Sequence, residues 1–238
     1  MVANFLKKIL QRQWSGFYRV SLDGKDFDFI VTHPLDFIQR CHLFGKFYDP
    51  KELDLIRSHF GDKKLRIADI GANVGNHSIF FAHFMNCEIV IPIEPNPRIL
   101  KTLRCNLGLN WHAAFDLSLV GYGLSDQEQY VDMVQGIDSN IGASSINPKV
   151  QGPIPVLPGH QALGSKNINF IKIDAEGHEW HILSGLIPII DQDKPAIYVE
   201  TREDTYEPVY RLMHDHDYTK VYTYNMYSDC MNTMFMPN

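Results

Sequence analysis

A glycine-containing turn between a predicted strand and a predicted helix constrains the fold of this chain more than any other feature. Residues 65–70 are mostly apolar and are typical of a buried strand, and residues 77–84 favour a helix. Between them, residues 69–76 read Asp-Ile-Gly-Ala-Asn-Val-Gly-Asn. Glycine lets the backbone approach a ligand closely, and a helix start offers unpaired N–H groups. This segment therefore predicts a ligand-binding turn at the edge of an α/β sheet.

The turn does not match the common phosphate-binding motifs. A dinucleotide fold requires Gly-x-Gly-x-x-Gly at this place, whereas the chain has Gly-Ala-Asn-Val-Gly. A Walker P-loop is excluded as well, because no Gly-Lys-Ser/Thr follows. Asp69, which opens the turn, suits a ligand that carries an amine and no phosphate. We therefore predict S-adenosylmethionine, which combines an amino-acid end with a ribose and an adenine.

Acidic residues also follow the next two predicted strands. Glu94 follows the apolar run 87–93, close to the offset of about 20 residues at which a ribose-binding acid is expected. A further predicted strand, 117–124, ends at Asp126, which could accept from the adenine amine. Ligands of open α/β sheets bind beyond the carboxyl ends of the strands. The predicted cofactor-binding residues are Asp69, Gly71, Ala72, Asn73, Gly75, Asn76, Glu94, Pro95, Asn96, Ser125 and Asp126.

A second motif crowds acids after another apolar strand. Residues 170–180 read Phe-Ile-Lys-Ile-Asp-Ala-Glu-Gly-His-Glu-Trp, and the strand 196–199 then leads to Glu200. If both strands belong to the same parallel sheet, their carboxyl ends face the crevice that also contains Gly71 and Glu94.

The two motifs together resemble the FkbM family of S-adenosylmethionine-dependent methyltransferases. The motif at 69–75, the Glu-Pro-Asn step at 94–96 and the motif at 171–179 match in order and separation, over roughly residues 45–202. The resemblance implies a class I methyltransferase fold of the α/β class, which is Rossmann-like. That fold has a mostly parallel seven-stranded sheet, helices on both faces and one antiparallel strand near the C-terminus. Phe-Tyr-Asp at 47–49 departs from the family's usual Tyr-Glu pair, so the role of Asp49 stays open.

The resemblance also implies methylation of oxygen, on a sugar, a glycoconjugate or a natural-product scaffold. A sugar hydroxyl is a poor nucleophile and benefits from a general base or a metal. We expect Asp174 to face the methyl-transfer site, with His178 or Glu176 as the proton acceptor, and Glu200 as a further candidate. His178 could instead cap or pack the helix start, and Glu176 and its neighbour Glu179 could serve only as favourable charges there. A divalent metal between Asp174 and Glu200 is a further possibility, because hard cations prefer carboxylate oxygens.

Two other functions stay open at this point. An enzyme of the same fold could methylate nitrogen in a small molecule or peptide, or the chain could bind the cofactor without turnover. Nucleic acid is disfavoured as a substrate, because the net charge is −6 and the chain lacks an Asn/Asp-Pro-Pro-Tyr segment. We expect a small-molecule or glycan acceptor, and the sequence does not predict the oligomeric state.

The chain is expected to contain an N-terminal cap, 1–62, and a cofactor-binding catalytic domain, 63–238. The polar stretch 135–152 either covers the substrate or is a surface loop. Residues 1–14 could form a helix that packs on the domain, with membrane-surface binding as the alternative. No stretch reaches the ~18 apolar residues of a spanning helix. The four cysteines, at 41, 87, 105 and 230, form no C-x-x-C pair. We therefore predict a cytoplasmic protein.

Overall fold

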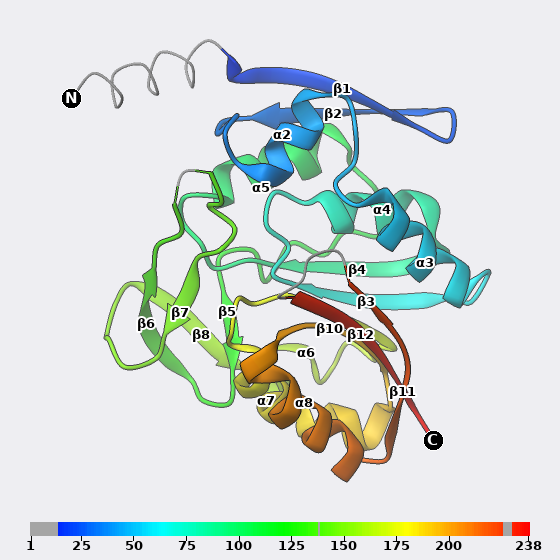
Figure 1. Cartoon of the computed structure of the whole chain (residues 1–238), viewed down its shortest axis with the longest axis vertical. Coiled ribbons are helices and arrows are strands. Elements are labelled where there is room, and N and C mark those ends of the chain that lie inside the picture. Colours follow the sequence, from blue (N-terminus) through cyan, green and yellow to red (C-terminus); the bar gives the residue numbers. More distant parts are fainter. Residues whose placement is uncertain (1–13, 138, 226–229) are drawn as a thin grey trace.

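The computed structural model describes residues 14–137, 139–225 and 230–238. Within these ranges, six strands form a central sheet in the order β11-β12-β10-β9-β3-β4 (Figure 1). Strands β4, β3, β9 and β10 run parallel, and β12 is antiparallel to both of its neighbours. Their bounds are Leu65–Ile70 (β3), Cys87–Ile93 (β4), Phe170–Ile173 (β9), Ala196–Arg202 (β10), Tyr218–Tyr224 (β11) and Cys230–Pro237 (β12). The expected antiparallel strand near the C-terminus is therefore present.

The prediction of a seven-stranded sheet is wrong in one place. Residues 117–122 contain turns and no strand, and among the described residues the isolated bridges Val90–Phe115 and Glu94–Val120 pair this region with β4. The backbone turns because Asp116 accepts from the Ser118 N–H at 3.0 Å and Gly121 has a φ of +110°. Leu119 and Val120 are buried nonetheless, which explains the strand-like apolar pattern.

The chain after these turns builds a second sheet, in the order β5-β8-β6-β7. Its strands are Gly123–Ser125 (β5), Gln129–Val134 (β6), Ser145–Asn147 (β7) and Ile154–Pro158 (β8). This four-stranded sheet projects from one side of the molecule in Figure 1. The predicted loop 135–152 connects β6 to β8 and contains the short β7.

Helices cover both faces of the central sheet, as predicted. Ile67 and Phe170 share a core with α3, α4 and α5, whereas Ile171 and Val199 share a core with α6, α7 and α8. Successive side chains of a strand point to opposite faces, so alternate apolar residues supply the two cores. The helices span Pro50–Phe60 (α3), Asn76–Phe84 (α4), Leu100–Leu109 (α5), Gly159–Leu163 (α6), Glu179–Asp193 (α7) and Glu203–Asp215 (α8).

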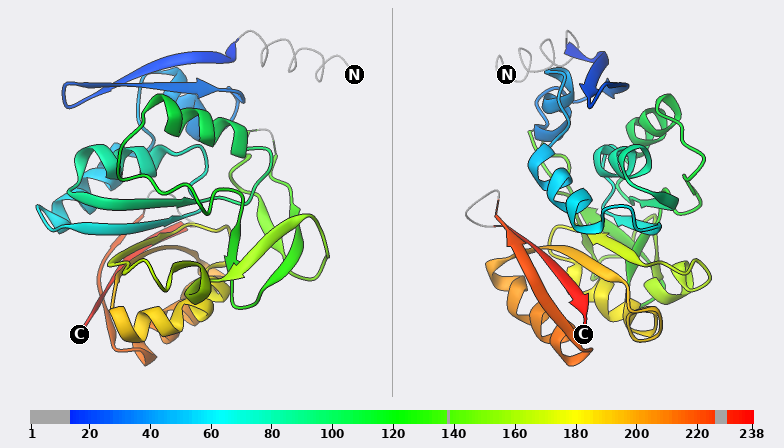
Figure 2. Two further views of the ribbon diagram at one scale, coloured as in Figure 1. Left: turned by 180° about the vertical axis from the view of Figure 1, so that it is seen from behind. Right: turned by 90° about the vertical axis from the view of Figure 1, so that its right-hand side faces the viewer.

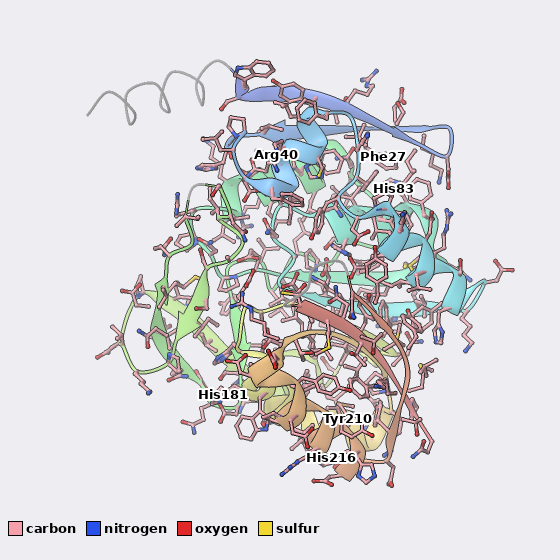
Figure 3. All side chains as sticks on the ribbon, in the orientation of Figure 1. Phe27, Arg40, His83, His181, Tyr210 and His216 are labelled. Carbon is pink, nitrogen blue, oxygen red and sulfur yellow. The ribbon has the colours of Figure 1, made fainter. Side chains whose placement is uncertain are left out.

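The N-terminal segment forms the hairpin β1 (Gly16–Leu22) and β2 (Lys25–Val31), followed by α2 (Phe37–Leu43). This hairpin lies at the opposite end of the molecule from α7 and α8 (Figure 2). The backbone N–H of Ile30 donates to the Asn106 side chain of α5, and that of Asp28 donates to Asn110, which caps the end of α5. Phe27 packs edge-on against His83 of α4 (Figure 3). The predicted helix over 1–14 lies, apart from residue 14, outside the described residues. The domain boundary at residue 62 stays a prediction.

The helix expected near Asp49 and Pro50 is α3. Asp49 caps it, because its Oδ1 accepts from the Glu52 N–H at 3.2 Å, and Pro50 occupies the first helical position. The same oxygen accepts from the Tyr224 hydroxyl at 3.0 Å, which ties α3 to the end of β11. The role of Asp49, which the sequence left open, is therefore at least structural: it caps α3 and binds Tyr224. In the part of the chain that the structure describes, we find no helix with the length and apolarity needed to cross a membrane.

Candidate active site

A cleft of about 420 Å³ opens at the carboxyl ends of the parallel strands of the central sheet. The glycine turn after β3 contributes Gly71 and Asn73, and the end of β4 contributes Glu94 and Pro95. Asp174 and Glu200 line it from β9 and β10. Its other lining residues are Phe37, Ile38 and Tyr48 from the cap, Met133, Ser139, Asn140, Gly142, Ser144 and Ile146 from the 133–146 segment, and Ile70, Ile93, Gly123, Leu124, Ala175, Glu176, Ile182, Arg202 and Cys230.

The glycine turn is built against the second motif. Gly71 has a φ of +79°, and a Cβ atom at this position would lie 1.8 Å from the backbone oxygen of Asp174. The N–H groups of Gly71 and Ala72 both donate to the carbonyl oxygen of Ile93, at 2.9 and 3.0 Å. Gly75, with a φ of +93°, caps the start of α4. Only glycine fits at position 71, so the turn and the end of β9 form one wall of the cleft.

Glu94 is held in place by the backbone. Its Oε2 accepts from the Asn73 N–H at 2.9 Å, and its Oε1 accepts from the Asn96 N–H at 2.8 Å. Burial raises the pKa of Glu94 to about 7, although both backbone hydrogen bonds oppose this shift. Each carboxylate oxygen has a further lone pair, so Glu94 can also accept hydrogen bonds from a ligand in the cleft.

Three acids face one another at the other end of the cleft. The charge of Asp174, together with burial, raises the pKa of Glu200 far above its ordinary value. Burial and the Asp174 charge raise the pKa of Glu176 to about 7, although Glu176 forms an ion pair with Arg202 that opposes the shift. Like charges this close disfavour simultaneous ionisation. The group can therefore hold a proton near neutral pH.

Lys172 lies next to these acids. The sequence analysis did not name it as a site residue. Its Nζ is 3.3 Å from Asp174 Oδ2, 3.4 Å from the Gly71 carbonyl oxygen and 3.8 Å from Asp69 Oδ1. Burial lowers its pKa, but the charges of Asp174 and Asp69 outweigh this effect and leave the pKa above its ordinary value. The signal was available in the sequence, because Lys172 interrupts the otherwise apolar strand 170–173.

Two residues of the first motif support the turn from outside the cleft. Asp69 is fully buried beneath it, and its Oδ2 accepts from the Ser78 hydroxyl at 2.5 Å. Asn76 is also buried and binds the cap, because its Oδ1 accepts from the Tyr48 N–H at 2.9 Å and lies 3.0 Å from His42 Nε2. Ala72, Gly75 and Asn96 adjoin the cleft without lining it.

The remaining predicted residues form a separate polar cluster. The Ser125 hydroxyl donates to Asp126 Oδ1 at 2.9 Å and lies 3.0 Å from His178 Nε2. His178 stacks on His181 of α7, which Figure 3 shows on the side of the molecule that also contains Tyr210. Burial lowers the pKa of His178 to about 4. None of Ser125, Asp126 and His178 lines the cleft described above, so the structure does not bring them together with Glu94 and Asp174.

The described residues contain no group of three or more His, Cys, Asp or Glu side chains arranged to hold a metal ion. The cap and the 133–146 segment supply the cleft's other wall. The sequence analysis offered the stretch 135–152 as a possible substrate cover but named no individual residue of this wall. Aromatic and small polar residues there carry no motif, and their place in the cleft depends on the tertiary fold.

Comparison with known proteins identifies the family. Residues 69–220 match the Methyltransferase FkbM domain, which is more than half of the chain. The chain belongs to the FkbM methyltransferase family. Hexuronic acid methyltransferase AglP from Haloferax volcanii is 26% identical over 121 residues, which cover 50% of this chain and 48% of that protein. The FkbM chain thus spans about half the length of this relative.

Solved structures show the same fold. Methyltransferase FkbM from Methylobacillus flagellatus KT has a TM-score of 0.50 at 18% identity, covering 82% of this chain and 52% of that one. Trm5b from Pyrococcus abyssi has a TM-score of 0.53 at 15% identity, covering 94% and 56%. The Rossmann-like methyltransferase fold is therefore shown, with the two sheets described above.

The cleft fits the cofactor that the family implies. Gly71 lines the cleft without a side chain, and Glu94 presents a backbone-anchored carboxylate in the same cleft. A carboxylate can accept from both hydroxyls of a ribose. Asp174 and Glu176 line the same cleft, and carboxylates there would attract a cationic sulfonium or ammonium group.

Proposed function

We propose that this protein is an S-adenosylmethionine-dependent O-methyltransferase that acts on a hydroxyl of a sugar, a glycoconjugate or a natural-product scaffold. The observation that carries the proposal is the convergence of Gly71, Glu94 and Asp174 on one cleft. Membership of the FkbM methyltransferase family supports the reaction, and the name of the relative AglP supports a sugar acceptor. We keep the predicted cytoplasmic location as part of this proposal.

The cofactor would bind at the end of the cleft that Gly71 and Glu94 line. Glu94 would bind the ribose hydroxyls, and the turn at Gly71 would let the ligand lie against the backbone. When bound, S-adenosylmethionine supplies an electrophilic methyl group, so that a bond from carbon to the acceptor oxygen forms as the carbon–sulfur bond breaks. The protein's main task is to align the acceptor with this methyl group, and such orientation can lower a barrier by ~7–11 kcal/mol.

The acids near the carboxyl ends of β9 and β10 would take up the proton that the acceptor hydroxyl releases. An acceptor hydroxyl loses one proton when it is methylated, and a carboxylate within hydrogen-bond reach can take it. Asp174 lines the cleft and forms an ion pair with Lys172, whose Nζ lies 3.3 Å from its Oδ2. Glu200, with its raised pKa, would instead donate a hydrogen bond to the acceptor. His178 is less suited to this task, because it lies in the cluster with Ser125. A metal between Asp174 and Glu200 is not needed for this scheme.

The cap and the 139–144 segment would bind the acceptor. Phe37 and Tyr48 line the cleft from the cap, and Ser139 and Asn140 line it from the opposite segment. Asp36 joins the two, because its Oδ1 accepts from the Gln39 N–H and its Oδ2 accepts from the buried Ile141 N–H at 2.9 Å. This arrangement places apolar rings and small polar groups together, as expected for a polyhydroxylated ligand with apolar C–H faces.

The proposal can be tested by methyl transfer from labelled S-adenosylmethionine to a panel of activated sugars and lipid-linked glycans, with small amines and peptides as the other arm. We expect label in a sugar product as an ether that survives mild base. Label only in amines would favour N-methylation. Cofactor binding without turnover on any acceptor would favour a non-catalytic binding protein.

A further inference from the structure

Lys172, a residue of the second motif, also contacts the first motif of the site. It stands in the middle of β9, and its side chain is 5% exposed. Strand register pairs Lys172 with Asp69 of β3 on one side and with Tyr198 of β10 on the other. A lysine ammonium buried at this depth is costly unless oxygens surround it.

The oxygens around Lys172 belong to the two ends of the cleft. Its Nζ donates to the carbonyl oxygen of Gly71, in the glycine turn, at 3.4 Å and to Oδ2 of Asp174, in the acid group, at 3.3 Å. Asp69 Oδ1 lies 3.8 Å away and accepts no hydrogen bond from any described residue. Glu52 of α3 and Glu200 of β10 also act on the ammonium electrostatically.

We propose that Lys172 is a positioning residue that fixes the Asp174 carboxylate to the Gly71 turn. The predicted cofactor-binding turn and the reacting acid are then held at a fixed distance from each other. This inference rests on the proposed function. Without the ammonium, Asp174 would lose its ion pair while the charges of Glu176 and Glu200 still act on the same group, and like-charge repulsion would turn its carboxylate. The Gly71 carbonyl would lose its side-chain hydrogen bond at the same time.

The test substitutes Lys172→Met and follows two quantities. The first is the affinity for S-adenosylmethionine by calorimetry, which needs no turnover. The second is the single-turnover methylation rate at saturating cofactor. We expect the affinity to fall about 5- to 20-fold and the rate to fall at least 30-fold. The matched control is Lys166→Met, because Lys166 makes a similar ion pair with Asp116, at 2.6 Å, and lies outside the cleft lining. The control should change each quantity by less than threefold.

A second arm separates positioning from simple stability. In an Asp174→Asn background, Lys172→Met should lower the rate by less than threefold further, because the carboxylate that it positions is already gone. A further loss of 30-fold there would overturn the proposal, and so would an unchanged affinity in the single variant. If Lys172→Met does not fold, the double variant Asp69→Asn/Lys172→Met takes its place in the same assays. The added Asp69→Asn substitution removes the buried Asp69 charge, which would otherwise lose the Lys172 ammonium beside it. A double variant that melts like the wild type and keeps wild-type affinity and rate would also overturn it.

Failure of the proposed function has a different signature. A wild-type protein that binds S-adenosylmethionine but methylates no acceptor would end the enzyme proposal. The affinities of Lys172→Met and Lys166→Met for S-adenosylmethionine, measured by calorimetry, would still decide whether Lys172 holds the glycine turn in its cofactor-binding position.

Discussion

The contact between Gly71 and the backbone of Asp174 gives a prediction whose size can be worked out. In a Gly71→Ala variant, the new Cβ would lie 1.8 Å from the Asp174 carbonyl oxygen. Real Cβ contacts essentially never fall below 3.0 Å, so the two segments must separate by about 1.2 Å. The end of β9 resists this shift, because the Asp174 N–H donates to the Ile70 carbonyl at 3.0 Å.

Gly24, in the hairpin turn between β1 and β2, is a matched control. Its φ is +76°, close to the +79° of Gly71, and a Cβ there would meet nothing within 4 Å. Gly24→Ala therefore measures the left-handed backbone cost alone, about 1–2 kcal/mol. Gly71→Ala adds an overpacking cost of about 1–3 kcal/mol. We expect the free energy of unfolding to fall by about 2–5 kcal/mol in the Gly71 variant.

Urea unfolding and calorimetry with S-adenosylmethionine would measure the effect. Gly71→Ala should lose at least tenfold in cofactor affinity, because the shift opens the wall between the glycine turn and Asp174. Gly24→Ala should bind the cofactor as the wild type does. The reasoning would be refuted if the two variants lost the same stability within about 0.5 kcal/mol, or if Gly71→Ala bound the cofactor normally.

Other predictions concern the acids of the site. Glu94→Ala should weaken S-adenosylmethionine binding about tenfold or more, since it removes the ribose acceptor; unchanged affinity by calorimetry would contradict that role. Asp174→Asn should lower turnover more than cofactor affinity, and full activity would remove it from the reacting group. Asp36→Ala should speed proteolysis within 135–152, because Ile141 loses its anchor; an unchanged cleavage rate would count against the link. The pKa values of Glu94 and Glu176 are about 7 in the folded protein, above the ordinary 4.5, so the unfolded state binds fewer protons between these values. Stability of the ligand-free protein should therefore fall by a few kcal/mol as pH rises from about 4.5 to 7, and a rise in melting temperature over this range would contradict the assignment.

Local chemistry made the framework of the site predictable. The glycine turn, the helix start at Pro50 and the strands leading to Glu94 and Asp174 all follow from short patterns that act within a few residues. Of the predicted strand 117–124, only the last two residues lie in a strand, β5. Residues 117–122 were mispredicted because Leu119 and Val120 are buried as strand residues are, although the backbone turns there.

Side-chain direction after a turn was harder to predict. Glu176 and Gly177 both have positive φ, of +54° and +97°, so the chain reverses between β9 and α7. Glu176 consequently lines the cleft, whereas His178, two residues later, packs against Ser125. Both residues were predicted as catalytic because they lie close together in the sequence. The backbone path after β9 directs their side chains to different sites. The acceptor wall depends in the same way on tertiary packing.

The central claim is that Gly71, Glu94 and Asp174 surround one S-adenosylmethionine molecule. A crystal structure of the protein with S-adenosylhomocysteine tests it most directly. The account predicts ribose hydroxyls within hydrogen-bond distance of the Glu94 carboxylate and the sulfur on the side of Asp174. A ligand bound elsewhere, or with its ribose away from Glu94, would contradict it.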